Sequence, residues 1–383
     1  MPEKTSSRLM QNFRFYLLLS LISSLLGSIA MAYMWYLADK AFVPTEHQLL
    51  TMSMARDNLK AKLALAGKDD IPECAQVATG VYLQSLNFHS ANDVHLSGYI
   101  WQKVPLAPDC PVQAKAGFYF PEAVEGANEL LKKYEYVQGN ETLHGWIFET
   151  TVRQPFDYSK YPLDHQTVWL RILSNDFDGY STLIPDLAAY PDTGIKSFFG
   201  LDSDIVLGDW LIDETFFDFK TATYHTNFGY QTATTELNPE LHFNVVLKRK
   251  FVNAFVVNLI PMLTVAALLF AVLMIISRKR STLAFNGFSI MSVIGTISAL
   301  FFVVILSHVN TRTKFPAQSI VYIEYFYLLL YIAMILVVLC SFIFNAPINV
   351  QRKLVMHDFM LPKLIYWPSL LLAMVIISYW ALF

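Results

Sequence analysis

The chain has 383 residues, of which 54% are hydrophobic, 15% are aromatic and only 15% are charged. Soluble proteins carry about a quarter charged residues, so this composition favours a membrane protein. The net charge of −3 gives no reason to expect a nucleic-acid partner. Three cysteines exclude both a disulfide-dense scaffold and a four-cysteine zinc site.

The first predicted element is an apolar segment at residues 15–37, which follows three basic side chains within residues 1–14. A secretory signal peptide is the alternative, because small residues around Ala30 resemble a cleavage site. A signal peptide has an apolar core of about 7–15 residues, whereas this segment runs for about 23. Trp35 and Tyr36 at its end are typical of the aromatic belt at a membrane surface. We therefore expect an uncleaved transmembrane helix, with residues 1–14 in the cytoplasm.

Residues 38–74 are predicted to form a linker that is partly helical, over 45–70. Short runs of alternating polar and apolar residues follow, separated by Pro, Gly, Asn and Asp, which is the pattern of β-strands joined by turns. These runs are 81–88, 95–103, 145–152, 167–173, 205–212 and 241–249. Residues 75–250 are therefore predicted to be a ligand-binding domain that folds as an antiparallel, immunoglobulin-like β-sandwich.

Two of the three cysteines belong to this water-side region, and the third, Cys340, lies in a later apolar run. Cys74 and Cys110 flank the predicted first hairpin and could form a disulfide if the domain faces an oxidising compartment. Spacing alone does not fix the distance between two cysteines, so the sequence leaves this pairing open.

Four more apolar runs follow residue 250, at 251–276, about 283–306, about 318–344 and 364–383. Each approaches the roughly 20 residues that a helix needs to cross a bilayer. Basic residues precede the first span and cluster again at 278–280 and 352–363. Five spans place all of these clusters on one side, as the positive-inside rule requires. The prediction is a multi-pass protein of the cell (inner) membrane, with residues 38–250 outside the cytoplasm and a four-helix bundle at 251–383.

Residues 156–166, FDYSKYPLDHQ, carry in order an aromatic residue, a proline, an apolar residue, an aspartate, any residue and a glutamine. This order resembles the signature loop of the pentameric ligand-gated ion channels, the Cys-loop receptor superfamily. Vertebrate members close that loop with two cysteines. Here the equivalent positions are Gln154 and Val168, as in bacterial members that lack the disulfide. Pro162 would stiffen an exposed turn, and Asp164 would place a charge at its tip.

The resemblance extends over about residues 75–383. Residues 81–103 are similar to the family's first hairpin, and residues 322–326 are similar to the start of its third membrane helix. Arg249 stands twelve residues before Pro261, which matches the family's pre-membrane arginine and first-helix proline.

The resemblance implies a homopentamer in membrane lipid, with a ligand-binding outer domain above a channel. It also implies that Asp93, Asp164 and Arg249 meet at the membrane face and, together with Pro261, couple the outer domain to the pore. An arginine–carboxylate pair in a partly buried place is a strong and directional link. The extra first helix has no counterpart in the common plan of the family.

In this family the second membrane helix after the outer domain lines the pore. Helical spacing then gives the predicted pore-lining residues Thr282, Asn286, Ser289, Val293, Thr296 and Leu300. Small hydroxyls along a water path, with apolar constrictions at Val293 and Leu300, suit a hydrophobic gate. The alternative is that these hydroxyls bond between membrane helices without a pore. Basic residues at 278–280 would favour anions, but the topology explains them equally, so the permeant ion stays open.

Agonists of this family bind between subunits in a box of aromatic side chains, which attracts ammonium ligands through cation–π contacts. The matching positions here are Trp101, Tyr190, Phe228 and Tyr230. The implied ligand is an unidentified small molecule or protons.

An enzyme is not expected, since the sequence contains no HExxH, no GxSxG and no phosphate-binding glycine loop. We therefore predict no catalytic residue, no metal site and no cofactor. The alternative function is a non-conducting membrane receptor or scaffold with the same fold. The predicted cytoplasmic segments are short, which leaves little room for a signalling domain and favours the channel.

Overall fold

The computed structural model describes residues 3–42, 48–65, 71–110, 113–175, 181–222, 225–226, 238–276, 290–315, 319–345 and 360–383. The chain divides into two compact units. The helical unit comprises Met1–Phe42, Asp157–Asp164 and Lys250–Phe383, and the β-rich unit comprises Val43–Phe156 and His165–Arg249. The turn at Asp157–Asp164 thus belongs to the helical unit, although it connects two strands of the β-rich unit.

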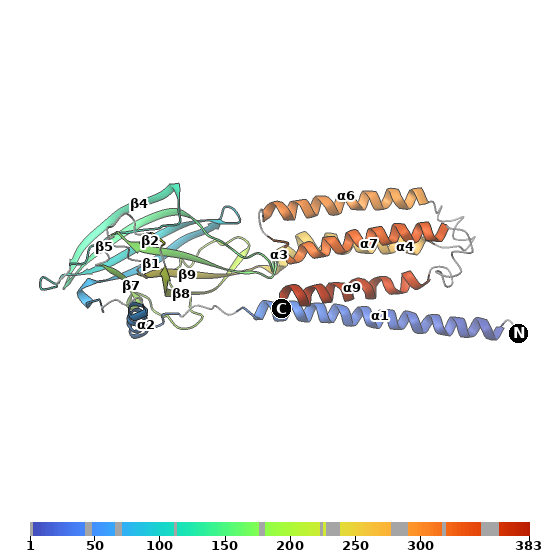
Figure 1. The fold of residues 1–383 in the computed structure, drawn as a ribbon, viewed down its shortest axis with the longest axis horizontal. Coiled ribbons are helices and arrows are strands. Elements are labelled where there is room, and N and C mark those ends of the chain that lie inside the picture. Colours follow the sequence, from blue (N-terminus) through green and yellow to red (C-terminus); the bar gives the residue numbers. More distant parts are fainter. Residues whose placement is uncertain are drawn as a thin grey trace. The chain divides into compact units, whose positions relative to one another are not determined.

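The β-rich unit contains two sheets (Figure 1). The first has the order β4-β5-β2-β1-β7, and the second has the order β3-β6-β9-β8. The strands of the first sheet are β1 (Gln76–Phe88), β2 (Asp93–Pro105), β4 (Ala123–Gln138), β5 (Glu141–Arg153) and β7 (Thr182–Pro185). Those of the second are β3 (Phe118–Tyr119), β6 (His165–Ser174), β8 (Trp210–Ala222) and β9 (Asn238–Arg249). All pairings are antiparallel except the parallel pair of β1 with β7.

Strict alternation of buried and part-exposed residues runs along β2, as expected for a strand with one face in a core. Strand β9 differs, because both of its faces are buried. One face carries apolar side chains such as Phe243, and the other carries Glu240 and His242. The Arg171 guanidinium, on β6, forms ion pairs with Glu240 (3.1 Å) and with Glu122. Charged groups on this face are therefore paired, as burial requires.

The prediction of an antiparallel β-rich domain is confirmed, with differences in individual elements. The strand predicted at 205–212 begins only at Trp210, because Gly208 adopts a φ of 57° in the preceding turn. Strand β4 was not predicted, since its sequence AVEGANELLKKYEYVQ lacks regular alternation. Within the predicted linker, the helix α2 (Met52–Leu65) begins after Thr51, whose hydroxyl accepts the Met54 N–H (3.2 Å) as an N-cap.

A disulfide joins Cys74 to Cys110, so the pairing that the sequence left open is present in the β-rich unit. Their Cα atoms are 6.0 Å apart, and the bond closes a loop with a sequence separation of 36. It ties the short helix η1 (Glu73–Ala75), just before β1, to the segment that follows β2.

Among the described residues, five helices are long and apolar enough to cross a membrane, which agrees with the number of spans predicted from the sequence. They are α1 (Glu3–Lys40), the continuous run of α3 (Phe251–Ala254), η3 (Phe255–Leu259) and α4 (Ile260–Ile275), and then α6 (Ile290–Lys314), α7 (Tyr322–Asn345) and α9 (Met360–Leu382). The segment η3 is a π-helical turn.

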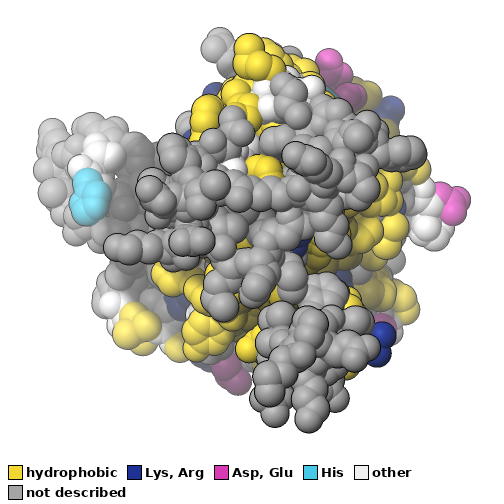
Figure 2. Space-filling model, turned by 90° about the vertical axis from the view of Figure 1, so that its right-hand side faces the viewer, with side chains coloured by type: hydrophobic (Ala, Val, Ile, Leu, Met, Phe, Trp, Pro, Cys, Tyr) yellow, Lys and Arg dark blue, Asp and Glu magenta, His cyan; other side chains and the backbone are white. Residues whose placement is uncertain are grey.

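Helix α1 lies along α9, while α6 packs on α7 and α4 at the other edge of the bundle (Figure 1). Large apolar side chains cover the outside of these helices: Leu25 is 62% exposed, Phe302 64% and Trp380 71%. The described side chains in the end-on view are likewise mostly hydrophobic (Figure 2). Such a surface is stable in lipid and costly in water.

The predicted end of the third span near residue 306 is wrong, because α6 continues to Lys314. Its last two turns carry polar side chains, including His308 and Thr311, which lower the apparent hydropathy. These side chains find hydrogen-bond partners on neighbouring helices, so the helix continues through them.

Candidate functional site

The turn Asp157–Asp164 is compact and mostly buried. Its backbone closes on itself through the hydrogen bonds from Tyr161 N to Tyr158 O (2.9 Å) and from Leu163 N to Lys160 O (2.8 Å). The Tyr161–Pro162 peptide bond is cis. Tyr158 is 2% exposed and Tyr161 is 5% exposed, so the turn presents aromatic side chains to the interior of the helical unit.

These aromatic side chains contact the end of α6. The rings of Tyr158 and Tyr161 both lie 4.7 Å from the ring of Phe315, measured between centroids. At the start of α7, the Tyr322 N–H donates to the Ser159 carbonyl oxygen (2.8 Å). The turn is therefore attached to both sides of the connection between α6 and α7.

Asn258, on a third helical segment, forms a hydrogen bond with the turn. It lies in η3, where Pro261 stands just beyond the π-helical turn. A proline has no N–H and clashes with the carbonyl four residues before it, and a π-helical turn accommodates that defect. The Asn258 Nδ2 atom donates to the Tyr161 hydroxyl (3.1 Å) and to the Ala254 carbonyl oxygen (3.0 Å).

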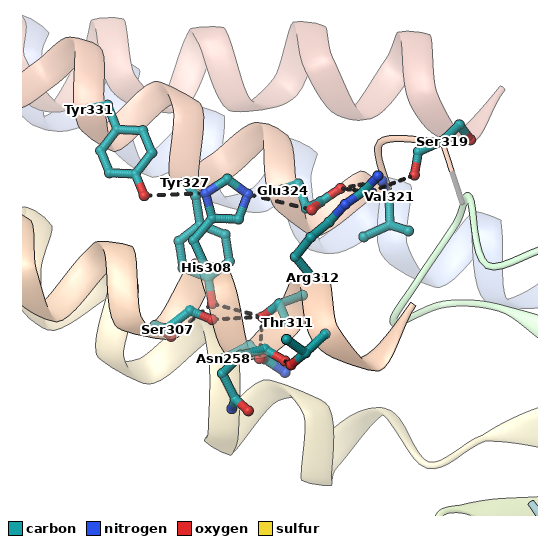
Figure 3. A network of polar contacts seen from close by, with 12 residues as sticks. Asn258, Ser307, His308, Thr311, Arg312, Ser319, Val321, Glu324, Tyr327 and Tyr331 are labelled. Carbon is teal, nitrogen blue, oxygen red and sulfur yellow. Dashed lines mark hydrogen bonds and ion pairs between the residues drawn. The ribbon is translucent and has the colours of Figure 1, made fainter. Parts of the chain in front are cut away.

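From Asn258 a hydrogen-bonded chain runs through the bundle (Figure 3). The Thr311 hydroxyl, on α6, lies 3.5 Å from Asn258 Oδ1 and 3.3 Å from the Tyr327 hydroxyl on α7. The Tyr327 hydroxyl in turn lies 2.9 Å from the Ser307 hydroxyl. Asn258, Thr311 and Tyr327 are at most 3% exposed, so this polar chain is sealed inside the helices.

Glu324 is the charged centre of the same region and is 3% exposed. Its Oε2 atom accepts from the Val321 N–H (2.9 Å) and from Arg312 Nη1 (3.2 Å). Its Oε1 atom lies 3.4 Å from His308 Nε2. Arg312 Nη1 also donates to the Ser319 carbonyl oxygen (3.1 Å). A buried carboxylate is tolerated only with such partners, and its place in the first turn of α7 favours negative charge.

His308 joins the charged centre to the aromatic side chains of α7. Its ring stacks on Tyr327 with the centroids 5.0 Å apart, and its Nδ1 atom lies 3.2 Å from the Tyr331 hydroxyl. A hydroxyl can donate or accept, so the Tyr331 hydroxyl can form this hydrogen bond with either tautomer of the imidazole. The end of α6 is thus bonded to η3, to α7 and, through Asn258, to the turn.

Contacts within the β-rich unit are described for two of the predicted coupling residues, Asp93 and Arg249. The Asp93 carboxylate binds Arg153 in two places (2.7 and 3.1 Å), and the hydrogen bond from Arg153 holds the pKa of Asp93 below its usual value. The Arg249 guanidinium lies 4.0 Å from the ring centroid of Trp210, in a cation–π contact. Asp164 is 2% exposed at the end of the turn.

The two described residues of the predicted aromatic box meet inside the β-rich unit. The rings of Trp101 and Tyr190 are 5.8 Å apart. Trp101 Nε1 donates to Asp186 (2.8 Å), and the Tyr190 hydroxyl bonds both the N–H (2.7 Å) and the carbonyl oxygen (2.8 Å) of Val81. Burial raises the pKa of Tyr190. The other two members, Phe228 and Tyr230, lie outside the described residues.

The predicted pore-lining stripe is only partly described, since Thr282, Asn286 and Ser289 lie outside the described residues. Val293 (5% exposed) and Leu300 (9%) are buried against the rest of the chain. Thr296 is exposed, and its hydroxyl donates to the Ser292 carbonyl oxygen (2.9 Å). The described part of the stripe therefore does not form one exposed face of a single chain.

Sequence reasoning missed Asn258, Thr311 and His308. Arg312 and Glu324 were also not among the site residues predicted from the sequence. The available signal was spacing: Ser307 with Thr311, and His308 with Arg312, are polar pairs four residues apart at the end of an apolar run. Residues at that spacing share one helix face, which favours a buried polar contact over a loop.

No family model matches the chain, and no curated protein matches its sequence. Among the described residues, no group of three or more His, Cys, Asp or Glu side chains is arranged to hold a metal ion.

Proposed function

We propose that this chain is the subunit of a homopentameric channel that passes small ions across a membrane when an agonist or protons bind to the β-rich unit. The observation that carries the proposal is the chain of hydrogen bonds from the turn through Asn258 and Thr311 to Tyr327 (Figure 3). The turn connects β5 to β6, so a rearrangement of those strands would move a segment that is bonded to α6 and α7.

Polar groups inside membrane helices are expensive and are retained mainly where they serve a function. A network that served only to hold the helices together could be replaced by apolar packing. Here the network lies where the turn meets the end of α6, which is where a displacement would be passed on. The position of the network therefore favours a role in coupling the turn to α6 over a role in helix packing alone.

An exposed face of α6 beside its buried side supplies the proposed pore lining. Its exposed residues recur at helical spacing: Ser292, Thr296, Ala299, Val303, Leu306 and Asn310. Small and hydroxyl-bearing side chains suit a water-filled path, and Val303 and Leu306 would form apolar constrictions along it. This face is rotated from the stripe predicted from the sequence, because Val293 and Leu300 are buried within the chain.

Recording in planar bilayers tests the proposal with a matched pair of variants. Thr311→Val removes a hydroxyl that contacts Asn258 and Tyr327. Thr264→Val is the control, because that exposed hydroxyl donates to the Ile260 carbonyl oxygen of its own helix (2.9 Å). We expect discrete openings from the wild type, an agonist or proton response shifted about fivefold in Thr311→Val, the equivalent of one lost hydrogen bond, and no shift in Thr264→Val.

Silence of the wild type across small amines, amino acids and the range from about pH 4 to about pH 8, over which His and carboxylates titrate, would remove the channel proposal. The alternative of a non-conducting receptor or scaffold would then stand. Conduction with equal responses of the two threonine variants would keep the channel and remove the coupling role of the network.

A further inference from the structure

Helix α1 packs on α9 along one face. Partly or fully buried residues of α1 follow helical spacing, and they include Ser20, Ser24, Gly27, Met31 and Trp35. The Ser20 hydroxyl donates to the Leu364 carbonyl oxygen (2.6 Å). A Cβ atom at Gly27 would lie 3.0 Å from the Leu371 Cβ atom, so a small residue there permits the close approach.

At its last turns α1 reaches a single hydroxyl group that is shared with two other helices. Trp35 Nε1 donates to the Tyr322 hydroxyl (2.7 Å), which also lies 2.5 Å from the Ser378 hydroxyl of α9. Ser378 in turn lies 3.2 Å from the Met31 sulfur atom. Tyr322 is 1% exposed and Ser378 is 0% exposed. The indole ring of Trp35 packs on Phe251, with the centroids 5.5 Å apart.

Tyr322 is also the residue of α7 that holds the turn, since its backbone N–H donates to the Ser159 carbonyl oxygen (2.8 Å). Its side chain is therefore hydrogen-bonded to α1, and its backbone N–H is hydrogen-bonded to the turn. Glu324, which anchors the Arg312 guanidinium, follows two residues later in the same helical turn.

We infer that α1 sets how firmly the turn is held, and that Trp35 is the positioning residue that acts through Tyr322. With the Trp35 bond made, the start of α7 is fixed and the Tyr322–Ser159 bond is kept closed. A displacement of α1 along α9 releases the Tyr322 hydroxyl first and then loosens the turn. The consequence for gating rests on the proposed function: a movement of α1 within the membrane changes the opening of the channel, so α1 is not only an anchor.

Hydrogen exchange of the purified full chain in lipid nanodiscs tests this inference without any current. Trp35→Phe removes the indole donor and keeps an aromatic ring beside Phe251. Ser20→Ala is the control, because it removes a hydrogen bond between α1 and α9 far along the helix from Tyr322. We expect the amide of Tyr322 to exchange about fivefold faster in Trp35→Phe, as for the loss of one hydrogen bond, and at the wild-type rate in Ser20→Ala.

A second variant keeps the test decisive if Trp35→Phe assembles poorly. Tyr322→Phe removes the shared hydroxyl and leaves the backbone N–H. Because both variants break the same bond, the double variant should exchange no faster than Tyr322→Phe alone. Additive effects, or equal rates in Trp35→Phe and Ser20→Ala, would overturn the inference.

Bilayer recordings separate this inference from the proposed function. If the wild type conducts, Trp35→Phe should shift the response and Ser20→Ala should leave it unchanged; equal responses would overturn the role in gating. If the wild type is silent, the channel is excluded, and the exchange rates alone decide whether α1 controls the turn.

Discussion

Trp101 and Tyr190, which match a ligand-site pattern in the sequence, also join neighbouring segments of the β-rich unit. A Cβ atom on Gly80 would lie 2.1 Å from the Trp101 ring, so glycine at this position allows the indole to lie against β1. The ring then donates to Asp186, which also pairs with Lys103 (2.7 Å). These polar contacts join β1, β2 and the segment after β7.

His144 gives the β-rich unit a predictable response to pH. Its side chain is 12% exposed, and burial lowers its pKa in spite of the nearby Glu135 carboxylate (3.9 Å). The unfolded chain takes up a proton near pH 6.5, roughly, whereas the folded chain resists it, so stability is lost as the pH falls below that value. We expect the midpoint temperature of unfolding to decrease as the pH is lowered from about 7 to about 5. The decrease should be smaller in His144→Gln.

The control for this prediction is His89→Gln, because His89 is exposed. Thermal unfolding of the full chain in detergent, followed at several pH values, provides the measurement. Identical pH profiles for the wild type and His144→Gln would contradict the assignment of the effect to burial of this imidazole.

Residue order identified the turn at Asp157–Asp164 but not its surroundings. A short pattern around Pro162 indicates a tight turn, because proline and aspartate act through the local backbone. The partners of Asn258 and Thr311 come from three separate segments, and no local pattern indicates which hydroxyl will face which helix. Polar residues inside a membrane unit are therefore predictable as buried and bonded, while their partners are not.

Among elements, prediction succeeded where one physical signal dominated. The spans were found because about 20 apolar residues have few alternatives to a membrane helix. The end of α6 was missed because hydropathy counts His308 and Thr311 as solvent-facing, whereas both are bonded to α7. Strand β4 was missed because it is an edge strand with many exposed charged side chains, so its sequence lacks an apolar face.

Gln154 links the strands on either side of the turn through hydrogen bonds and not through a covalent bond. It follows β5, is 1% exposed, and its amide bonds both the N–H (3.2 Å) and the carbonyl oxygen of Trp169 on β6. A side-chain amide thus links the two strands at that point by pairing with the backbone of β6.

We expect Gln154→Ala to lower the free energy of unfolding by about 1–3 kcal/mol, since it leaves two buried backbone groups of Trp169 without these partners. Denaturant unfolding of the full chain, followed by tryptophan fluorescence, measures the change. Gln138→Ala, at the exposed end of β4, is the matched control. Equal midpoints for the two variants would show that the amide does not contribute to stability.

For the whole molecule, the disulfide bears on topology as well as on stability. Disulfides persist in oxidising compartments, so the Cys74–Cys110 bond agrees with the proposed location of the β-rich unit outside the cytoplasm. Closing a loop of 36 residues restricts the unfolded chain and stabilises the fold by roughly 4 kcal/mol.

Replacing both cysteines by serine should therefore lower the free energy of unfolding of the β-rich unit by about 2–5 kcal/mol. Reductant should lower the free energy of unfolding of the wild type to the value of this variant. It should leave the value of the variant unchanged. Cys340→Ser, which removes the free cysteine of α7, is the control and should respond as the wild type does. A wild type that is insensitive to full reduction would contradict a stabilising role.

The assembled molecule must bring one face of α6 to water if the chain forms a channel, and thiol chemistry can identify that face. A charged, membrane-impermeant reagent modifies only ionised thiols in contact with water, so thiols that face lipid or packed protein are protected. In a Cys340→Ser background, we expect Ser292→Cys and Thr296→Cys to react in reconstituted vesicles, because both side chains are exposed on α6. Val293→Cys should stay protected, because Val293 is 5% exposed. Reaction of Val293→Cys together with protection of Ser292→Cys would mean that α6 is rotated in the assembly toward the stripe predicted from the sequence. Protection of all three positions would mean that neither face meets water, and a central path lined by α6 would be excluded.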